Sequence, residues 1–244
     1  MKAILLVAGY ATRLYPLTEN FPKPLLPINN KPILEYIVED LNSIDEIDSI
    51  ILVSNHKFIN HFNEWALRRD NSKPIYVLDD GTTSNDNRLG AIRDILLAIN
   101  GYNIVDDILV LAGDNIYDFS LNKLVKDFYT FGDNTVLAHK ELSIEKLRKT
   151  GVAEIINHQV IGFEEKPASP KGEYAIPPFY AYKSTTIDLI KKYVEQGYNV
   201  DAPGSLIGYL VKNSQVFISE MSGTRYDIGD LVSYEEAIKK FKHK

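Results

Sequence analysis

Short apolar runs alternate with amphipathic stretches through the first half of the chain. Runs of strand length lie at 2–8, 49–54, 75–78 and 108–112. Their continuous apolar character predicts strands buried on both faces. Apolar residues recur at helical spacing in the stretches 33–41, 57–69 and 89–99. Strands that alternate with helices of this length predict βαβ units and a mostly parallel sheet, which is a Rossmann-like α/β arrangement.

The pattern changes beyond about residue 134. Short β-like segments follow at 135–139, 152–156, 159–163 and 180–182. Asn157 and His158 form a turn between the second and third of these, which predicts a hairpin set laid on the sheet. Helical spacing returns at 187–194 and again near the end of the chain at 231–241.

Composition narrows the class of protein. The chain has 244 residues, 45% of them hydrophobic, which is enough for one domain spanning residues 1–244. The net charge of −6 and the absence of a Lys/Arg block argue against a nucleic-acid partner. The absence of cysteine excludes disulfides, thiolate zinc sites and cysteine nucleophiles. The apolar runs are too short for a membrane span or a signal peptide, so we expect a cytoplasmic protein.

The first apolar run passes directly into a loop rich in proline and cations. This loop comprises Gly9–Thr18 and Pro22–Ile28. In open α/β sheets, ligands gather outside the carboxyl ends of the strands, so Arg13 and Lys23 are expected to face a ligand. Glu19 is the only acidic residue between Lys2 and Lys31, so this segment is locally positive. A phosphate-rich ligand would suit it.

The loop resembles the amino-terminal signature of the sugar-1-phosphate nucleotidyltransferases, glucose-1-phosphate thymidylyltransferases among them. That signature reads Gly-Gly-x-Gly-Thr-Arg-Leu-x-Pro-Leu-Thr, followed by Pro-Lys-Pro-Leu-Leu-Pro. Ala8, Gly9, Tyr10 and Ala11 stand where it has Gly, Gly, any residue and Gly. Because alanine lacks glycine's access to positive φ, the path of the loop around the nucleotide is expected to differ in detail. The resemblance implies a GT-A type three-layer α/β/α sandwich with a mostly parallel mixed sheet; a turn that only packs is the competing interpretation.

Two aspartates match the family's metal-binding positions. Leu111–Asn115 places Asp114 directly after a predicted strand, and the resemblance assigns this residue to Mg²⁺ held against the nucleotide. It also assigns Gly113 to a close backbone approach to the nucleotide. Asp227, in Tyr226-Asp-Ile-Gly-Asp230, resembles the second metal-binding aspartate of the family. Mg²⁺ is commonly held by one or two carboxylates with phosphate oxygens and water, although Asp114 could instead cap a helix or turn.

A second group of residues matches the family's sugar-phosphate site. Phe163–Pro167 resembles the Glu-Glu-Lys-Pro element, so the resemblance assigns Glu165 to sugar hydroxyls and Lys166 to the sugar phosphate. Gly151 matches a glycine that lets the backbone approach the sugar, and Tyr180 lies on the strand near the sugar.

The residues that select the base are less well matched. Asp79 stands where thymidylyltransferases usually present glutamine, and Gly90 is also assigned to the nucleotide. A carboxylate only accepts hydrogen bonds, so Asp79 could take N3–H of uracil or thymine, or two donors of guanine. The resemblance therefore places dTTP or UTP ahead of GTP. His56 and His61 are five residues apart, which does not align them on one helix face, and we interpret them as surface or capping histidines.

These parts imply that a sugar-1-phosphate oxygen attacks the α-phosphate of a nucleoside triphosphate, giving an NDP-sugar and pyrophosphate. Such a reaction depends on positioning and charge stabilisation, which Arg13, Lys23 and Lys166 would supply with the metal. Two alternatives are a phosphocholine cytidylyltransferase-like enzyme and a non-catalytic nucleotide-binding regulatory subunit. Members of the family commonly associate as homo-oligomers, which we also expect here.

Overall fold

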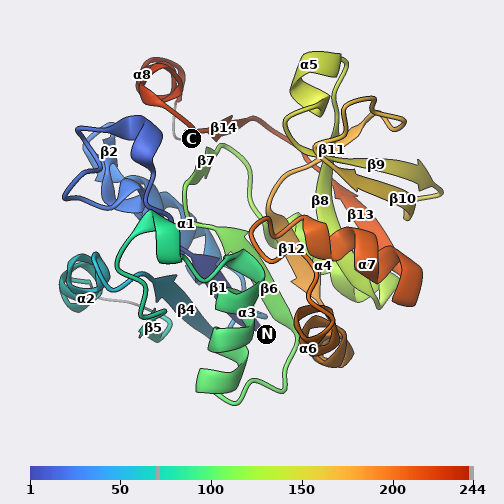
Figure 1. Cartoon of the computed structure of the whole chain (residues 1–244), viewed down its shortest axis with the longest axis horizontal. Helices are drawn as coiled ribbons and strands as arrows, with labels where there is room; N and C mark the ends of the chain where they lie inside the picture. The colour runs from blue at the N-terminus through green and yellow to red at the C-terminus, as the bar shows by residue number, and fades with distance from the viewer. Residues whose placement is uncertain (70–71, 242–244) are drawn as a thin grey trace. The chain divides into compact units, whose positions relative to one another are not determined.

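The computed structural model describes residues 1–69 and 72–241 (Figure 1). Its contacts divide the chain into two compact units. Unit 1 comprises the described residues of Met1–Arg88, Ala112–Leu121 and Ser222–Lys244. Unit 2 comprises Leu89–Leu111 and Asn122–Met221. Three separate segments of the chain therefore build unit 1.

Unit 1 contains a parallel three-stranded sheet. Its strands are β1 (Lys2–Leu6), β4 (Ser49–Ser54) and β5 (Ile75–Asp79). Strand β4 pairs with β1 on one side and β5 on the other, and all six of its residues are buried. The predicted strands are confirmed, as is the prediction of parallel pairing. Short strands complete the unit: β2 (Pro27–Ile28), β3 (Lys31–Pro32), β7 (Asn115–Tyr117) and β14 (Arg225–Asp227).

The helices of unit 1 form where the apolar spacing predicts them. They are α1 (Ile33–Asn42), α2 (Ile59–Leu67) and α8 (Leu231–Lys240). Helix α1 begins directly after Pro32, whose fixed φ suits a helix start, and its apolar face is fully buried. Helix α8 is capped by Asp230, which accepts a hydrogen bond from the Ser233 amide. One buried cluster of this unit joins α1 and α8: Leu14, Leu26, Ile28, Ile33, Tyr36, Ile116, Ile228, Tyr234, Ala237 and Phe241.

Unit 2 contains a mixed sheet in the order β11-β9-β10-β13-β8-β12-β6. Its strands are β6 (Ile108–Ala112), β8 (Asn134–Lys140), β9 (Gly151–Ile156), β10 (Gln159–Glu165), β11 (Tyr174–Ile176), β12 (Phe179–Tyr182) and β13 (Val216–Glu220). The last residue of β6, Ala112, already belongs to unit 1. The predicted β9–β10 hairpin is confirmed. Asn157 and His158 both have positive φ, as a type I′ turn requires.

Helices cover this sheet. They are α3 (Ala91–Gly101), α4 (Asn122–Phe131), α5 (Ile144–Leu147), α6 (Ile187–Glu195) and α7 (Ser205–Asn213). Helix α4 packs on β8 and β13, and α7 packs on β10 and β13. The α/β class is confirmed, but the sequence pattern left α4, α7 and β13 unassigned. Helix α4 is hard to find because only Leu124, Val125 and Phe128 are buried among polar neighbours.

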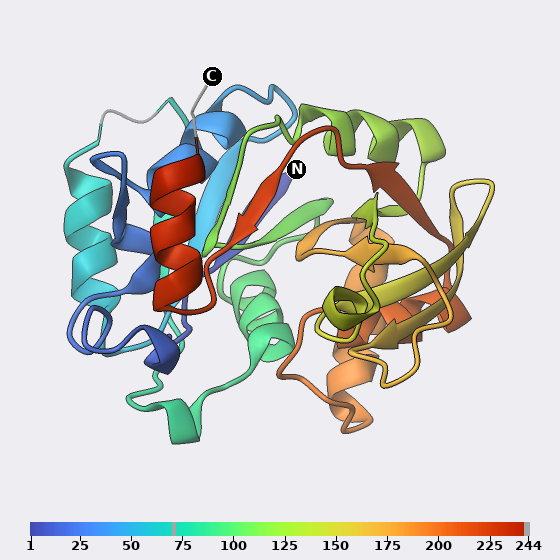
Figure 2. The same cartoon turned by 90° about the horizontal axis from the view of Figure 1, so that it is seen from above.

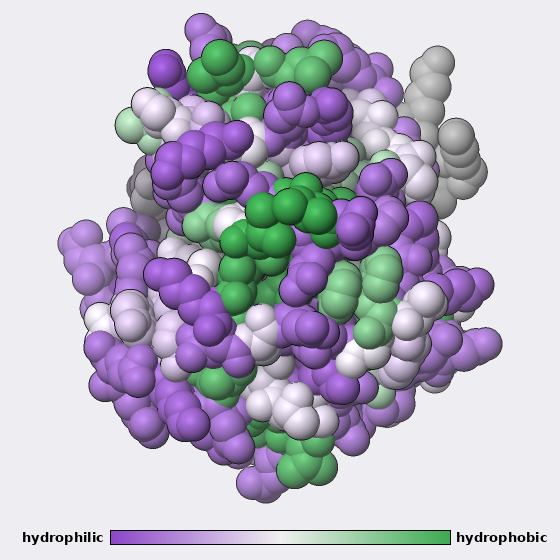
Figure 3. All heavy atoms as spheres, turned by 90° about the vertical axis from the view of Figure 1, so that its right-hand side faces the viewer, coloured by the Kyte–Doolittle hydropathy of each residue, from purple (hydrophilic) through white to green (hydrophobic). Residues whose placement is uncertain are grey.

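The surface carries scattered apolar side chains. Figure 3 shows one face on which apolar side chains gather within a largely hydrophilic surround. In unit 2, Ile156 and Ile161 of the β9–β10 hairpin are 57% and 52% exposed. Among the described residues, no helix is long and apolar enough to cross a membrane.

Candidate active site

A cavity of about 180 Å³ lies at the carboxyl end of β1 in unit 1. Gly9, Arg13, Lys23 and Asp114 are all part of its lining. The sequence analysis predicted each of them at a nucleotide site, and the fold brings them together. The cavity is smaller than the 300–1,000 Å³ or so that encloses a whole small ligand, so it suits the phosphate end of a nucleotide.

The first loop reaches this cavity through a left-handed residue. Ala11 has φ 46°, and its carbonyl accepts hydrogen bonds from the Thr18 hydroxyl at 2.8 Å and the Leu14 amide at 2.9 Å. Ala11 thus adopts a conformation that glycine reaches more easily, and those two bonds hold the turn. A left-handed alanine costs roughly 1–2 kcal/mol. Backbone strain of this kind concentrates at functional sites. Leu14 is 1% exposed and anchors the loop, whereas Arg13 is exposed.

Lys23 and Asp114 form an ion pair inside the cavity. Lys23 Nζ lies 2.8 Å from Asp114 Oδ2, and the Lys23 residue is only 6% exposed. Asn115 Nδ2 donates to the other oxygen, Asp114 Oδ1, at 2.9 Å. A buried ammonium group needs such a partner. Asp114 is thus a partner of Lys23 rather than a helix cap.

Gly113 is required by packing. A Cβ atom there would lie 2.4 Å from Val7 Cγ1, and the Gly113 amide donates to the Leu6 carbonyl at 3.0 Å. Gly113 therefore approaches the end of β1 closely, and its approach to the nucleotide stays a prediction. The approach to β1 sets the position from which Asp114 enters the cavity.

Asp227 is the last residue of strand β14. Strand β14 pairs antiparallel with β7 (Figure 2). Within this pair, Asp227 is in register with Asn115, the residue after Asp114. Arg225 pairs with Asp227 at 3.6 Å, and the Asp227 side chain is 64% exposed. Within residues 1–69 and 72–241, no group of three or more His, Cys, Asp or Glu side chains is arranged to hold a metal. The donor set is two carboxylates, which fits Mg²⁺ because that ion takes most of its ligands from phosphate and water.

The same edge of the sheet continues across the ends of β4 and β5. Asn55 Nδ2 donates to the Ala8 carbonyl at 2.8 Å and so fixes the start of the loop. Asp79, the last residue of β5, accepts hydrogen bonds from the Gly81 amide at 2.8 Å and the His56 ring at 2.6 Å. His56 is exposed, as predicted, but its pairing with Asp79 was missed. The only sequence signal was that both residues stand at the ends of apolar runs.

Unit 2 holds the predicted sugar-phosphate residues at the end of β10. Glu165 is in register with Gly151 of β9. A Cβ atom on Gly204 would lie 2.2 Å from Glu165 Oε2, and one on Gly151 would lie 3.1 Å from that oxygen. Burial raises the pKa of Glu165, and the neighbouring Lys166 only partly offsets this. The Glu165 carboxylate makes no hydrogen bond with any residue that the structure describes.

Lys166 has an unusual backbone. Its φ is 47°, and its amide donates to the Thr150 carbonyl at 3.1 Å. Two other predicted residues have clear packing roles: Tyr180, predicted near the sugar, and Gly90, predicted at the nucleotide. Tyr180 is 2% exposed and stacks on Tyr182 in the core of unit 2. Gly90, at φ 97°, begins helix α3, and a Cβ atom there would lie 2.9 Å from Val200. Direct ligand contacts by Tyr180 and Gly90 stay predictions.

A family model described as nucleotidyl transferase matches residues 2–244. The chain belongs to the nucleotidyl transferase family. A curated relative, the bifunctional protein GlmU of Methanococcus maripaludis (strain C7 / ATCC BAA-1331), is 30% identical over 233 residues, which cover 94% of this chain and 51% of the relative. The UTP–glucose-1-phosphate uridylyltransferase of Synechocystis sp. (strain ATCC 27184 / PCC 6803 / Kazusa) is 28% identical over 254 residues, 98% of this chain and 63% of the relative.

The fold of this nucleotidyl transferase also occurs among solved structures. A Bacillus anthracis protein, provisionally assigned as a glucose-1-phosphate thymidylyltransferase and determined with sucrose, matches with a TM-score of 0.80. The identity is 24%, and the match covers 100% of this chain and 97% of that protein. These likenesses confirm the predicted fold and family. The chain spans about half the length, or less, of the GlmU relatives.

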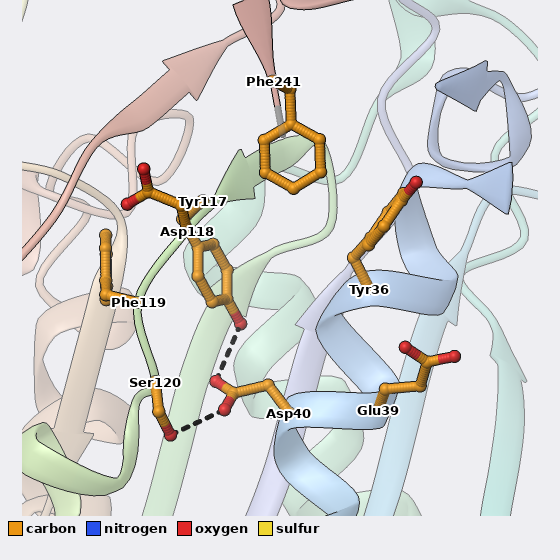
Figure 4. A pocket seen from close by; sticks show the side chains of 8 residues that line it. All are labelled: Tyr36, Glu39, Asp40, Tyr117, Asp118, Phe119, Ser120 and Phe241. Atoms are coloured by element: carbon orange, nitrogen blue, oxygen red, sulfur yellow. Dashed lines mark hydrogen bonds between the residues drawn. The ribbon is translucent and has the colours of Figure 1, made fainter. Parts of the chain in front are cut away.

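A second cavity of this nucleotidyl transferase, about 300 Å³ in volume, lies in unit 1 beside helix α1 (Figure 4). Asp40 points into it and accepts hydrogen bonds from the Ser120 hydroxyl at 2.7 Å and the Tyr117 hydroxyl at 3.3 Å. Burial raises the pKa of Asp40, and these bonds offset the effect in part. Glu39 and Asp118 also line the cavity, and none of its described lining residues is a cation. A triphosphate therefore suits the smaller cavity around Arg13 and Lys23 and not this one.

Proposed function

We propose that the chain transfers a nucleoside monophosphate from a nucleoside triphosphate to a sugar-1-phosphate, giving an NDP-sugar and pyrophosphate. The observation that carries this proposal is the cavity at the end of β1, where Arg13, Lys23 and Asp114 meet in a member of the nucleotidyl transferase family. The names of the relatives, which include a UTP–glucose-1-phosphate uridylyltransferase, support the choice of a sugar-1-phosphate as acceptor.

The two cations of the cavity have different surroundings and so different proposed roles. Arg13 is exposed at its rim and would neutralise the β- and γ-phosphates, which leave as pyrophosphate. Lys23 is buried and held by Asp114, so its ammonium group is already positioned to neutralise charge on the α-phosphate. Fixed charges of this kind stabilise the transition state without reorganising during the reaction. The backbone at Ala8 and Gly9 would lie along the nucleotide.

Asp114 and Asp227 would hold Mg²⁺. Their carboxylate oxygens are hard donors, and two of them leave room for phosphate oxygens and water. When bound, the ion supplies positive charge against the triphosphate. Asp114 and Asp227 are exposed enough to accept it, at 39% and 64% of their side-chain surfaces.

Unit 2 would bind the acceptor. No described residue donates a hydrogen bond to the Glu165 carboxylate, so it can accept hydrogen bonds from sugar hydroxyls. Lys166 provides a cation for the sugar phosphate, and its left-handed backbone is the strain expected at a binding position. Gly151 is buried against the Phe163 ring, and its lack of a side chain leaves room for the Glu165 carboxylate.

The reaction needs no protein nucleophile. An oxygen of the sugar phosphate forms a bond to the α-phosphorus while the bond from that phosphorus to the bridging oxygen of the β-phosphate breaks. The electron pair and negative charge leave on pyrophosphate. The protein contributes orientation and charge neutralisation, which suffice for much of the rate enhancement in such transfers.

The deciding experiment is pyrophosphate release with Mg²⁺. Each of dTTP, UTP, GTP, CTP and ATP is tested against a panel of sugar-1-phosphates and phosphocholine. We expect turnover with one sugar-1-phosphate and loss of turnover in Asp114→Asn. Asp86→Asn, on an exposed turn of the same unit, is the matched control. Turnover only with phosphocholine and CTP would replace the sugar by that acceptor, and nucleotide binding without any turnover would indicate a regulatory protein.

A further inference from the structure

His56 and Asp79 form a fixed pair at the edge of the unit 1 sheet. Their strands, β4 and β5, are parallel neighbours, with Ser54 in register with Asp79. His56 Nδ1 lies 2.6 Å from Asp79 Oδ2, and 62% of the His56 side chain is exposed. A carboxylate can only accept a hydrogen bond, so the proton of the pair is on Nδ1. In the neutral ring, Nε2 then carries a lone pair and acts as an acceptor.

The surrounding backbone holds this pair in place. The second oxygen of Asp79 accepts the Gly81 amide at 2.8 Å, and the His56 amide donates to the Thr82 carbonyl at 2.8 Å. Thr82 in turn makes a hydrogen bond of 3.2 Å with the hydroxyl of Tyr10, in the first loop. The imidazole is therefore oriented by groups that are themselves fixed.

The pair also lies within a nucleoside's reach of the proposed phosphate site. Neighbouring strands are about 4.8 Å apart, so the ends of β1 and β5 are separated by roughly 10 Å. Gly9, which follows β1 and lines the cavity, has open space where a side chain would stand. A nucleotide whose phosphates bind at Arg13 and Lys23 can extend over Gly9 toward His56.

We propose that His56 reads the base of the nucleotide and that Asp79 positions it. This inference rests on the proposed function. Nε2 of His56 would accept N3–H of uracil or thymine, or N1–H of guanine. Cytosine N3 and adenine N1 carry lone pairs in the corresponding places. Each would face the lone pair of Nε2, and two acceptors cannot form a hydrogen bond. The site thus selects UTP, dTTP or GTP against CTP and ATP, and Asp79 acts through the histidine instead of contacting the base itself.

The test compares UTP with CTP in the wild type and in His56→Phe, which keeps the ring and removes both nitrogens. Affinity is measured by calorimetry without acceptor, and kcat and KM with acceptor. We expect the preference for UTP to fall about tenfold in His56→Phe, the value of one hydrogen bond left unmade, through KM and not kcat. His61→Gln should keep the preference, because the ring of His61, in helix α2, packs against Phe21 and Phe58.

Asp79→Asn tests the positioning role. Its amide can donate to Nδ1, which moves the ring proton to Nε2 and turns that atom into a donor. The preference should then shift toward CTP, whose N3 accepts a hydrogen bond. If Asp79 had a purely structural role, Asp79→Asn would weaken the binding of UTP and CTP equally.

The outcomes separate this inference from the proposed function. Normal turnover with an unchanged UTP:CTP ratio in His56→Phe, or a wild type that prefers CTP or ATP, overturns the inference alone. A wild type that binds UTP through His56 but releases no pyrophosphate with any acceptor overturns the transferase and leaves the inference standing. A wild type that binds no nucleotide overturns both.

Discussion

Asp114 in unit 1 and Glu165 in unit 2 are both proposed to serve the same reaction, but their surroundings differ. The two oxygens of Asp114 are already engaged, by Lys23 and Asn115. Glu165 has no such partner among the described residues, and burial raises its pKa. The carboxylate of the proposed nucleotide site is therefore paired before any substrate binds. The proposed acceptor site keeps a partly buried carboxylate without a partner among the described residues, which lowers the stability of the fold.

The backbone gives a second comparison, in which the two units are alike. Ala11 in unit 1 and Lys166 in unit 2 are left-handed, with φ of 46° and 47°. Each costs roughly 1–2 kcal/mol relative to an ordinary conformation. Both belong to segments that the motifs identified. The units therefore share backbone strain but differ in how their charges are paired, and substitutions can separate the two effects.

The largest effect is expected at the paired charge. Lys23→Met removes the proposed cation at the α-phosphate, so kcat should fall about 10²–10³-fold, as on loss of one oxyanion donor. Pyrophosphate release measures this. Lys31→Met is the control because Lys31 pairs with Glu39 outside the cavity, where a surface pair contributes at most about 1 kcal/mol. A Lys23→Met enzyme within a few-fold of the wild type would remove Lys23 from the mechanism.

Glu165→Gln tests the Glu165 carboxylate, which has no partner among the described residues. The amide keeps the shape but is a weaker acceptor, so KM for the sugar-1-phosphate should rise about tenfold while KM for the nucleotide holds. Glu164→Gln, one residue earlier and paired with Lys171, is the control.

The same substitution has a pH signature. The pKa of Glu165 in the folded state is raised above its ordinary value of 4.5. The folded protein is therefore more stable when the Glu165 carboxyl is protonated than when it is charged. That contribution is fully present below pH 4.5 and is lost as pH rises through the folded pKa. Glu165→Gln should therefore be more stable than the wild type at pH 7 and lose this advantage near pH 4. Urea unfolding at both pH values measures this difference in stability. If Glu165→Gln were equally more stable at both pH values, the charge on Glu165 would not destabilise the folded protein.

Features encoded locally could be predicted from the sequence, and long-range pairs could not. The six buried residues of β4 and the amphipathic face of α1 are visible as apolar patterns. Motif resemblance identified Arg13 and Asp114. The ion pair between Lys23 and Asp114 joins residues 91 positions apart, and the His56–Asp79 pair depends on the register of two parallel strands. No local spacing reveals either contact.

Gly204→Ala tests how Glu165 is positioned. The added Cβ would lie 2.2 Å from Glu165 Oε2, so that side chain must move. We expect a loss of about 1 kcal/mol in the free energy of unfolding, typical of overpacking, and a several-fold higher KM for the acceptor. Gly208→Ala lies in helix α7, where the new Cβ would make only ordinary contacts, and should instead stabilise by roughly 0.5–1 kcal/mol. Equal behaviour of the two variants would show that Gly204 does not position Glu165.

The smallest effect separates strain from charge. Ala11→Gly and Lys166→Gly each relieve a left-handed residue, and each also adds unfolded-state entropy. The net gain in the free energy of unfolding is expected to be roughly 0.5–1 kcal/mol for both. Only Lys166→Gly also removes a cation, so only it should raise KM for the sugar-1-phosphate. Urea unfolding and acceptor kinetics on the two variants measure both quantities. If Lys166→Gly gains stability and keeps the acceptor KM, its left-handed backbone has a purely structural origin, and the sugar phosphate is bound by another cation.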